Sequence, residues 1–177
     1  YAHVADYLTR LGYVLWAADL RGHGKSGGKR GHVDRFEDYL ADLRQLTAIA
    51  RERAPEAKTF LAGHSLGGLI TADYALKYQD ELAGLILSAP ALAELVEVPS
   101  TKALMGRVLS PLMPTFTAAT GLNPNLISRD REIVRKYVED PMIHGVATVR
   151  WFTEYRQAQE RAMRFADEVR LPCLIVQ

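Results

Sequence analysis

The chain has 177 residues and a formal net charge of +1, because 22 lysine and arginine side chains nearly balance 21 aspartate and glutamate side chains. Apolar residue types make up 48% of it, which is enough to build a core and excludes a disordered chain. The balanced charge gives no basic surface for a nucleic acid, so a polyanionic substrate is not expected.

The cysteine count and the first residue limit what can be expected of disulfides and of location. Cys173 is the only cysteine, so no intrachain disulfide can form; it lies in an apolar run and is expected in the core. No stretch reaches the length of a membrane span. The first residue is Tyr1, so a signal peptide can be neither assigned nor excluded. A cytoplasmic or peripheral membrane location is favoured.

The first part of the chain alternates helix and strand patterns. It predicts a helix over residues 1–11, a buried strand over 13–18, a glycine-rich loop and a second helix over 35–53. Asp34 and Glu37 have the spacing of a capping box at the start of the second helix.

The alternation continues with a strand over residues 59–62, a helix over 66–78 and a strand over 82–88. The last strand is apolar throughout its middle, which is typical of a parallel strand buried on both faces. The pattern predicts an alpha/beta fold with a mostly parallel sheet flanked by helices. Ligands of such sheets bind beyond the carboxyl ends of the strands. Three polar residues are expected there: Asp19, Ser65 and Ser88.

A G-x-S-x-G sequence lies between the predicted strand over 59–62 and the helix that follows it. In that context it is typical of a nucleophile elbow, whose serine has a strained backbone and stands above the sheet. Ser65 is therefore predicted to be a catalytic nucleophile, and the Leu66 backbone N–H, at the positive end of the helix, one oxyanion donor. Gly63 and Gly67 support the elbow and are expected where a Cβ would collide with the neighbouring element.

The pattern then breaks. Over residues 92–166 there is no clear strand, only helix-like pieces interrupted by prolines, and a strand returns over 171–176. The sequence therefore predicts the first part of a sheet core over 1–91, an inserted helical cap over 92–166 and a return to the core over 167–177.

The loop of residues 19–27, Asp-Leu-Arg-Gly-His-Gly-Lys-Ser-Gly, and the elbow together resemble the alpha/beta-hydrolase superfamily. Within it, the chain is similar to the monoacylglycerol lipase and lysophospholipase-like group, also described as serine aminopeptidase S33. The resemblance covers nearly the whole chain and implies a lid over the active site. Four more positions carry it: Gly31, Phe36, Tyr39 and Asp42.

The resemblance also implies a triad in the chain order serine, acid, histidine, with the acid after the strand over 171–176. The triad acid, the histidine and the second oxyanion donor are therefore expected outside residues 1–177. The chain is expected to be the middle of a longer hydrolase, incomplete at both termini, and to be inactive by itself.

No internal histidine is expected to replace the missing base. His64 adjoins the nucleophile, but neighbouring side chains at a tight turn diverge. His23 is expected to support the loop, and His144 to be structural or to face the substrate. His3 and His32 are expected on the surface.

Other kinds of site receive no support from the sequence. Asp19 is expected to hydrogen-bond the loop that follows it rather than to take part in catalysis. The Gly-His-Gly spacing lacks the Walker pattern, so no nucleotide site is expected. No metal site is supported, and serine chemistry needs no cofactor.

The predicted cap contains an apolar stripe and a charged face. The stripe either packs a cap helix on the core or forms a hydrophobic rim that admits an acyl chain or rests on a lipid surface. Residues 128–136 are typical of a solvated helical face, and Asp140-Pro141 of a helix end. The stripe consists of Ala103, Leu104, Met105, Val108, Leu109, Leu112, Met113 and Phe116.

The leading hypothesis is a serine esterase or lipase that hydrolyses monoacylglycerol, lysophospholipid or related acyl esters through an acyl-enzyme on Ser65. A peptidase or another acyl hydrolase of the same fold is an alternative, because the fold does not fix the leaving group. A non-catalytic ligand-binding relative is a third interpretation. Acyl esters or lipids are the expected ligands, contact of the cap with a lipid surface is one of the interpretations of its apolar stripe, and no protein partner is inferred.

Overall fold

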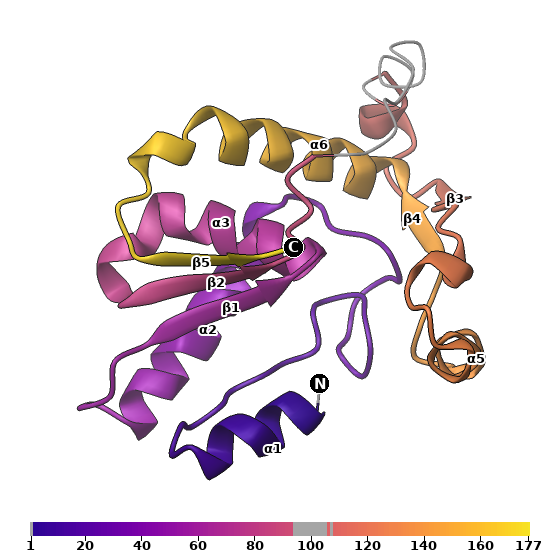
Figure 1. The fold of residues 1–177 in the computed structure, drawn as a ribbon. Coiled ribbons are helices and arrows are strands. Elements are labelled where there is room, and N and C mark those ends of the chain that lie inside the picture. The colour runs from indigo at the N-terminus through magenta and orange to yellow at the C-terminus, as the bar shows by residue number, and fades with distance from the viewer. Residues whose placement is uncertain (1, 94–105, 107) are drawn as a thin grey trace.

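The computed structural model of the chain describes residues 2–93, 106 and 108–177. Its main sheet has three parallel strands in the order β1-β2-β5: β1 is Phe60–His64, β2 is Gly84–Ser88 and β5 is Cys173–Val176. His64 pairs with Ser88, and Ser88 with Val176. The carboxyl ends of the strands therefore meet along one edge of the sheet (Figure 1). The predicted parallel alpha/beta sheet is confirmed.

Helices flank the sheet, and α3 is the one most enclosed. Figure 1 shows α3 between the sheet and α6, in agreement with the contacts of α3 to β1, β2 and α6. Among the described residues, no helix is long and apolar enough to cross a membrane. The helices are α1 (Ala2–Arg10), α2 (Glu37–Arg53), α3 (Leu66–Tyr78), α5 (Arg131–Glu139) and α6 (Val149–Arg164), with short 3-10 turns η1 (Gln79–Glu81), η2 (Pro124–Leu126) and η3 (Ala166–Glu168).

The core lies around α3, which is apolar on nearly all sides. Tyr39 and Leu40 of α2 and Ala158 and Ala162 of α6 are buried in the same cluster as the α3 side chains. A helix that is apolar all round is stable only inside a protein. The α2 and α6 contacts therefore fix α3, and with it the turn at which α3 begins.

The strand predicted over residues 13–18 is wrong. The segment has no strand assignment, and all of its residues are exposed, Val14 to 68%. Figure 1 shows it running between α1 and β1. Its apolar pattern is typical of a strand, but a strand also needs a hydrogen-bonding neighbour, and none of the described residues pairs with it.

The capping box predicted at Asp34 and Glu37 is also wrong. Helix α2 begins at Glu37 and has no side-chain cap from its N-cap residue. Asp34 instead lies 3.3 Å from His32 Nε2. The free N–H groups before the helix are satisfied from elsewhere: Asp38 accepts from the Arg35 N–H, and Glu154 of α6 accepts from the Phe36 N–H at 3.0 Å.

A small two-stranded antiparallel sheet lies in the region where no strand was predicted. Its strands, β3 (Thr117–Ala119) and β4 (Val146–Thr148), pair with each other. Figure 1 shows them beyond the carboxyl edge of the main sheet. Strands of three residues are too short to show an alternating pattern, which is why the sequence does not reveal them.

The predicted end of α5 is confirmed, because its C-cap is Asp140.

Cys173, predicted in the core, is exposed instead. It begins β5, one of the two outer strands of the described sheet, and all four residues of β5 are exposed. The apolar run identifies the strand correctly but does not tell a central strand from an outer one.

Candidate active site

Ser65 lies at the turn between β1 and α3, at the carboxyl edge of the sheet. Its backbone has φ 51° and ψ −117°, and the residue is exposed. A positive φ costs a residue with a side chain about 1–3 kcal/mol and persists only where the surroundings impose it. The Ser65 hydroxyl does not cap α3, a helix that the structure describes completely. The strained and exposed serine predicted from the sequence is therefore present.

The helix that starts at Leu66 faces the same edge. The first N–H groups of a helix have no partner within the helix, and the aligned peptide dipoles make that end positive. Leu66 is the first residue of α3, directly after Ser65. Its N–H is suited to hydrogen-bond an oxyanion that forms beside the serine.

The glycines around the serine differ in the space that a side chain would have at each position. A Cβ at Gly63 would collide with the Gly67 carbonyl oxygen and would lie 2.6 Å from Thr71 Oγ1. At Gly67 no described atom lies within 4 Å of a Cβ, so the predicted collision there is wrong. Gly68, which the sequence analysis did not single out, is crowded: a Cβ would lie 2.7 Å from Pro90 Cβ.

Among the histidines, His64 is directed along the sheet edge. Its Nδ1 lies 3.1 Å from the Oγ of Ser88, its register partner on β2. His3 is exposed, as expected. His32, predicted on the surface, is largely buried, with 12% of its side chain exposed. Its Nδ1 lies 2.8 Å from Thr148 Oγ1 of β4, a contact between segments 116 residues apart that local sequence does not reveal.

His23, in the loop after residue 20, and His144, just before β4, contact each other. Their ring centroids are 4.8 Å apart, and His144 Nε2 lies 3.0 Å from the Gly22 carbonyl oxygen. Burial lowers the pKa of His23, although the Arg21 carbonyl contact opposes this. His144 thus has a structural role, one of the two roles expected for it.

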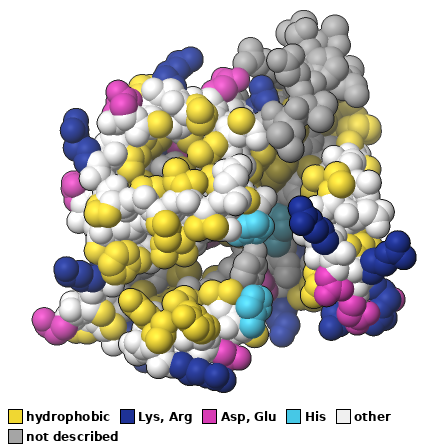
Figure 2. Space-filling model, viewed as in Figure 1, with side chains coloured by type: hydrophobic (Ala, Val, Ile, Leu, Met, Phe, Trp, Pro, Cys, Tyr) yellow, Lys and Arg dark blue, Asp and Glu magenta, His cyan; other side chains and the backbone are white. Residues whose placement is uncertain are grey.

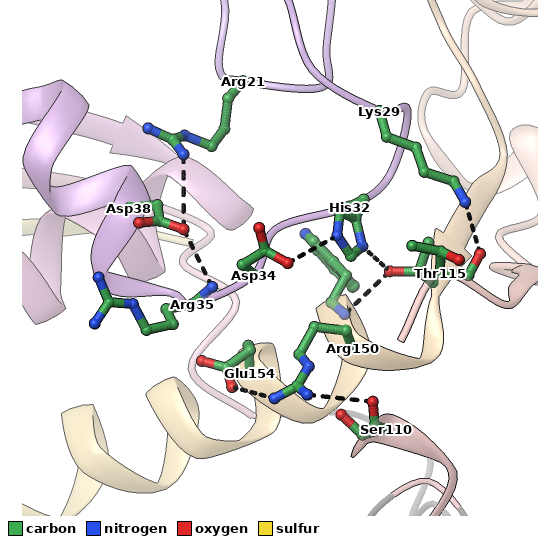
Figure 3. Close-up of polar contacts among 12 residues, drawn as sticks. Arg21, Lys29, His32, Asp34, Arg35, Asp38, Ser110, Thr115, Arg150 and Glu154 are labelled. Atoms are coloured by element: carbon green, nitrogen blue, oxygen red, sulfur yellow. Dashed lines mark hydrogen bonds and ion pairs between the residues drawn. The ribbon is translucent and has the colours of Figure 1, made fainter. Parts of the chain in front are cut away.

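The loop after residue 20 hydrogen-bonds to β4 and to the segment before β3 (Figure 3). Lys29 Nζ donates to the Thr115 carbonyl oxygen at 2.7 Å, and the Thr148 N–H donates to the Gly31 carbonyl oxygen at 2.8 Å. A Cβ at Gly31 would collide with the Val146 carbonyl oxygen, which explains a glycine at this close approach.

Asp19 holds this loop, as expected. Its carboxylate accepts from the Lys25 N–H at 2.8 Å, and its carbonyl oxygen accepts from the Ser26 hydroxyl at 2.7 Å. A Cβ at Gly24 would collide with the Asp19 carboxylate. The acidic side chain at the end of the predicted strand is thus engaged within its own loop.

Two of the resemblance positions, Tyr39 and Asp42, join α2 to α6 and to the loop after residue 20. Asp42 accepts two hydrogen bonds from Arg21, each 2.6 Å long, and these raise the pKa of the Arg21 guanidinium. Tyr39 OH accepts a hydrogen bond from Trp151 Nε1 at 3.0 Å. Burial raises the pKa of Tyr39 to about 12, so its hydroxyl stays neutral at ordinary pH.

The surface around the sheet edge is apolar and hollowed. Figure 2 shows a hollow with histidine side chains at its border and apolar side chains around it. Leu112, Met113 and Phe116 of the predicted stripe are each at least half exposed, so they do not pack against the described core. Ala103, Leu104 and Met105 lie outside the described residues. No group of three metal-ligating side chains occurs in the part of the chain that the structure describes.

One buried ion pair next to the elbow was missed from the sequence. Asp73 on α3 is completely buried and accepts hydrogen bonds of 2.7 and 2.6 Å from Arg161 on α6. This contact raises the pKa of Arg161. The available signal was a lone aspartate in the otherwise apolar middle of α3, since a buried carboxylate needs a cationic partner.

Comparisons with known proteins place the chain among hydrolases. Residues 1–177 match the family described as serine aminopeptidase, S33. Monoacylglycerol lipase from Mycolicibacterium smegmatis is 36% identical over 144 residues, which cover 81% of this chain and 51% of that protein. Rat monoglyceride lipase is 31% identical and is matched over 100% of this chain and 59% of its own length.

A solved structure gives the same picture for the fold. The crystal structure of monoacylglycerol lipase from Paleococcus ferrophilus superposes with a TM-score of 0.89 at 33% identity, covering 99% of this chain and 66% of that chain. The chain thus spans about half to two thirds of the length of these relatives.

Proposed function

This chain belongs to the serine aminopeptidase S33 family and has the alpha/beta-hydrolase fold, and from that premise we propose that the complete gene product is a carboxylic-ester hydrolase with Ser65 as its nucleophile. The observation that carries the proposal is the backbone of Ser65, which has φ 51° at the junction of strand β1 and the N-terminus of helix α3. Strain of this kind, at an exposed serine, is typical of a nucleophile elbow.

In the proposed reaction the Ser65 hydroxyl gives its proton to a general base and attacks the ester carbonyl carbon, the carbon–oxygen bond to the alcohol breaks, and the alcohol leaves with that proton. Water then hydrolyses the remaining acyl-enzyme, which releases the carboxylic acid and restores the serine hydroxyl. The carbonyl oxygen becomes negatively charged in each step, and the Leu66 N–H stabilises it. The chemistry also requires a general base and an acid that orients it. The proposal assigns neither of them to residues 1–177.

The proposed substrates are monoacylglycerols, lysophospholipids or related acyl esters. The names of similar proteins support this class: monoacylglycerol lipase in Mycolicibacterium smegmatis and monoglyceride lipase in rat. The proposed cap over residues 92–166 would then cover the site from beyond the carboxyl edge, where the small β3–β4 sheet lies. Exposed Leu112, Met113 and Phe116 support contact of that cap with an acyl chain or a lipid surface.

The test is covalent labelling of the complete gene product with a fluorophosphonate probe, followed by peptide mapping. Labelling at Ser65 that disappears in Ser65→Ala is the expected result, and labelling that survives this substitution would contradict the assignment. Rates on monoacylglycerols, lysophospholipids and aminoacyl amides then distinguish an esterase from a peptidase. A protein that binds these compounds but neither labels nor hydrolyses would be a non-catalytic relative.

A further inference from the structure

The backbone of Ser65 is held on two sides by residues 88–91, the segment that follows β2. The Ser65 N–H donates to the Ser88 carbonyl oxygen, and the Ala91 N–H donates to the Ser65 carbonyl oxygen, both at 3.0 Å. The segment is itself strained, because Ala89 has φ 38°. Residues 88–91 therefore form one wall of the turn that orients Ser65.

Gln159 supports this wall from helix α6. Its Nε2 donates to the Ala91 carbonyl oxygen at 2.9 Å and to Tyr155 OH at 3.0 Å, and the residue is only 4% exposed. The Tyr155 ring is stacked on Trp151, with the planes 11° apart, which holds the ring that carries this hydroxyl group in place. Gln159 Oε1 has no partner among the described residues, so the donor end of the side chain is the one that acts here.

Positive φ angles at residues with side chains persist only where surrounding contacts impose them. Ser65 and Ala89 both have such angles, and they are joined through the 88–91 segment. The bond from Gln159 fixes the far end of that segment to α6, which in turn packs on α3.

We propose that Gln159 is a positioning residue for Ser65. By holding the Ala91 carbonyl, it keeps the Ala91 N–H on the Ser65 carbonyl, and so keeps the serine hydroxyl directed to one place beside the first N–H groups of α3. This inference rests on the proposed function, in which Ser65 is the nucleophile. It assigns no contact with substrate to Gln159.

The experiment measures the second-order rate of fluorophosphonate labelling at Ser65 in the complete gene product. Gln159→Leu keeps a side chain of similar volume but cannot donate, and labelling should slow about ten-fold or more, because small misplacement of a reacting group has large effects on rate. Gln157 provides the matched control, since it is a glutamine on the same helix but is exposed. Gln157→Leu should label at the wild-type rate.

Gln159→Glu gives a readout that a purely structural role would not change. An ionised carboxylate cannot donate to the Ala91 carbonyl, whereas a protonated carboxyl can. The ratio of the Gln159→Glu rate to the wild-type rate should therefore rise as the pH falls, and the same ratio for Gln157→Glu should stay flat.

The outcomes separate this inference from the proposal on which it rests. A wild-type protein that is not labelled at Ser65 contradicts the proposed function. A labelled wild type together with a Gln159→Leu variant as fast as Gln157→Leu contradicts the role of Gln159 alone. If Gln159→Leu does not fold, Gln159→Glu decides, and a ratio independent of pH overturns the inference.

Discussion

The buried pair of Asp73 and Arg161 predicts an asymmetric effect of substitution on stability. Asp73 is completely buried, whereas 27% of the Arg161 side chain is exposed and its NH2 group also lies 3.5 Å from Glu37. Removing the arginine leaves a carboxylate with neither water nor a cation. Removing the aspartate leaves a guanidinium that keeps both water and a second carboxylate.

The magnitudes follow from this difference. Arg161→Met should lower the free energy of unfolding by about 3–5 kcal/mol, the range for a buried charge that loses its partner. Asp73→Leu branches at Cγ as aspartate does and should lower it by only about 1–2 kcal/mol, because Arg161 turns to Glu37 and solvent. The double variant replaces the pair with apolar groups and should be more stable than Arg161→Met alone.

Urea unfolding of the complete gene product, followed by circular dichroism at pH 7, measures these differences. Arg135→Met is the control: Arg135 has the same bidentate geometry with Glu132, but both side chains are at least half exposed, so no measurable change is expected. Two results would refute the reasoning. One is a smaller loss for Arg161→Met than for Asp73→Leu, and the other is a double variant whose loss equals the sum of the single losses.

Three further predictions concern the elbow, the loop and the exposed stripe. Gly63→Ala should lower the unfolding free energy by about 1–3 kcal/mol or more, because its Cβ meets the Gly67 carbonyl, whereas Gly67→Ala, with open space around it, should fold normally in the same urea assay. Burial lowers the pKa of His23 below the value of about 6.5 in the unfolded chain, so its contribution to stability is fully present above about pH 6.5 and is lost as the pH falls from there through the lowered pKa of the folded protein; His23→Phe should flatten this acid-side decline in urea midpoints. Leu112→Ser combined with Phe116→Ser should leave the urea midpoint unchanged, because both side chains are exposed, but should reduce hydrolysis of long-chain esters more than of short ones; an equal loss on both contradicts a role in acyl-chain contact.

The parts of the fold that sequence reasoning found are those with local causes. A strand, G-x-S-x-G and a helix follow one another within 19 residues, and steric limits at the turn act between immediate neighbours, so the geometry of Ser65 could be expected. Helix α3 and strand β2 are similarly encoded by continuous apolar runs.

The parts that it missed depend on residues far apart in the chain. Residues 13–18 have a strand pattern, but a pattern cannot state whether a partner strand lies alongside. His32 lies in a polar, glycine-rich segment that is typical of an exposed loop. It is largely buried because β4, with Thr148 116 positions later, packs against it. The prediction of a capping box was wrong for the same reason, because the Phe36 N–H donates a hydrogen bond to Glu154 on α6.

Helix α6 concentrates these distant contacts close to the candidate nucleophile. Gln159 and Arg161 are two residues apart. Gln159 hydrogen-bonds to the segment after β2, and Arg161 hydrogen-bonds to Asp73 in the middle of α3, the helix that follows Ser65. Their polar groups bond to partners 68 and 88 positions away, so neither could be interpreted from its own neighbourhood in the sequence. The turn at Ser65 is encoded locally, but its strained angle is maintained by what packs around it. A substitution on α6 should therefore affect the serine without touching it, and labelling of Ser65 in the Gln159 and Arg161 variants tests whether reactivity and stability depend on the same helix.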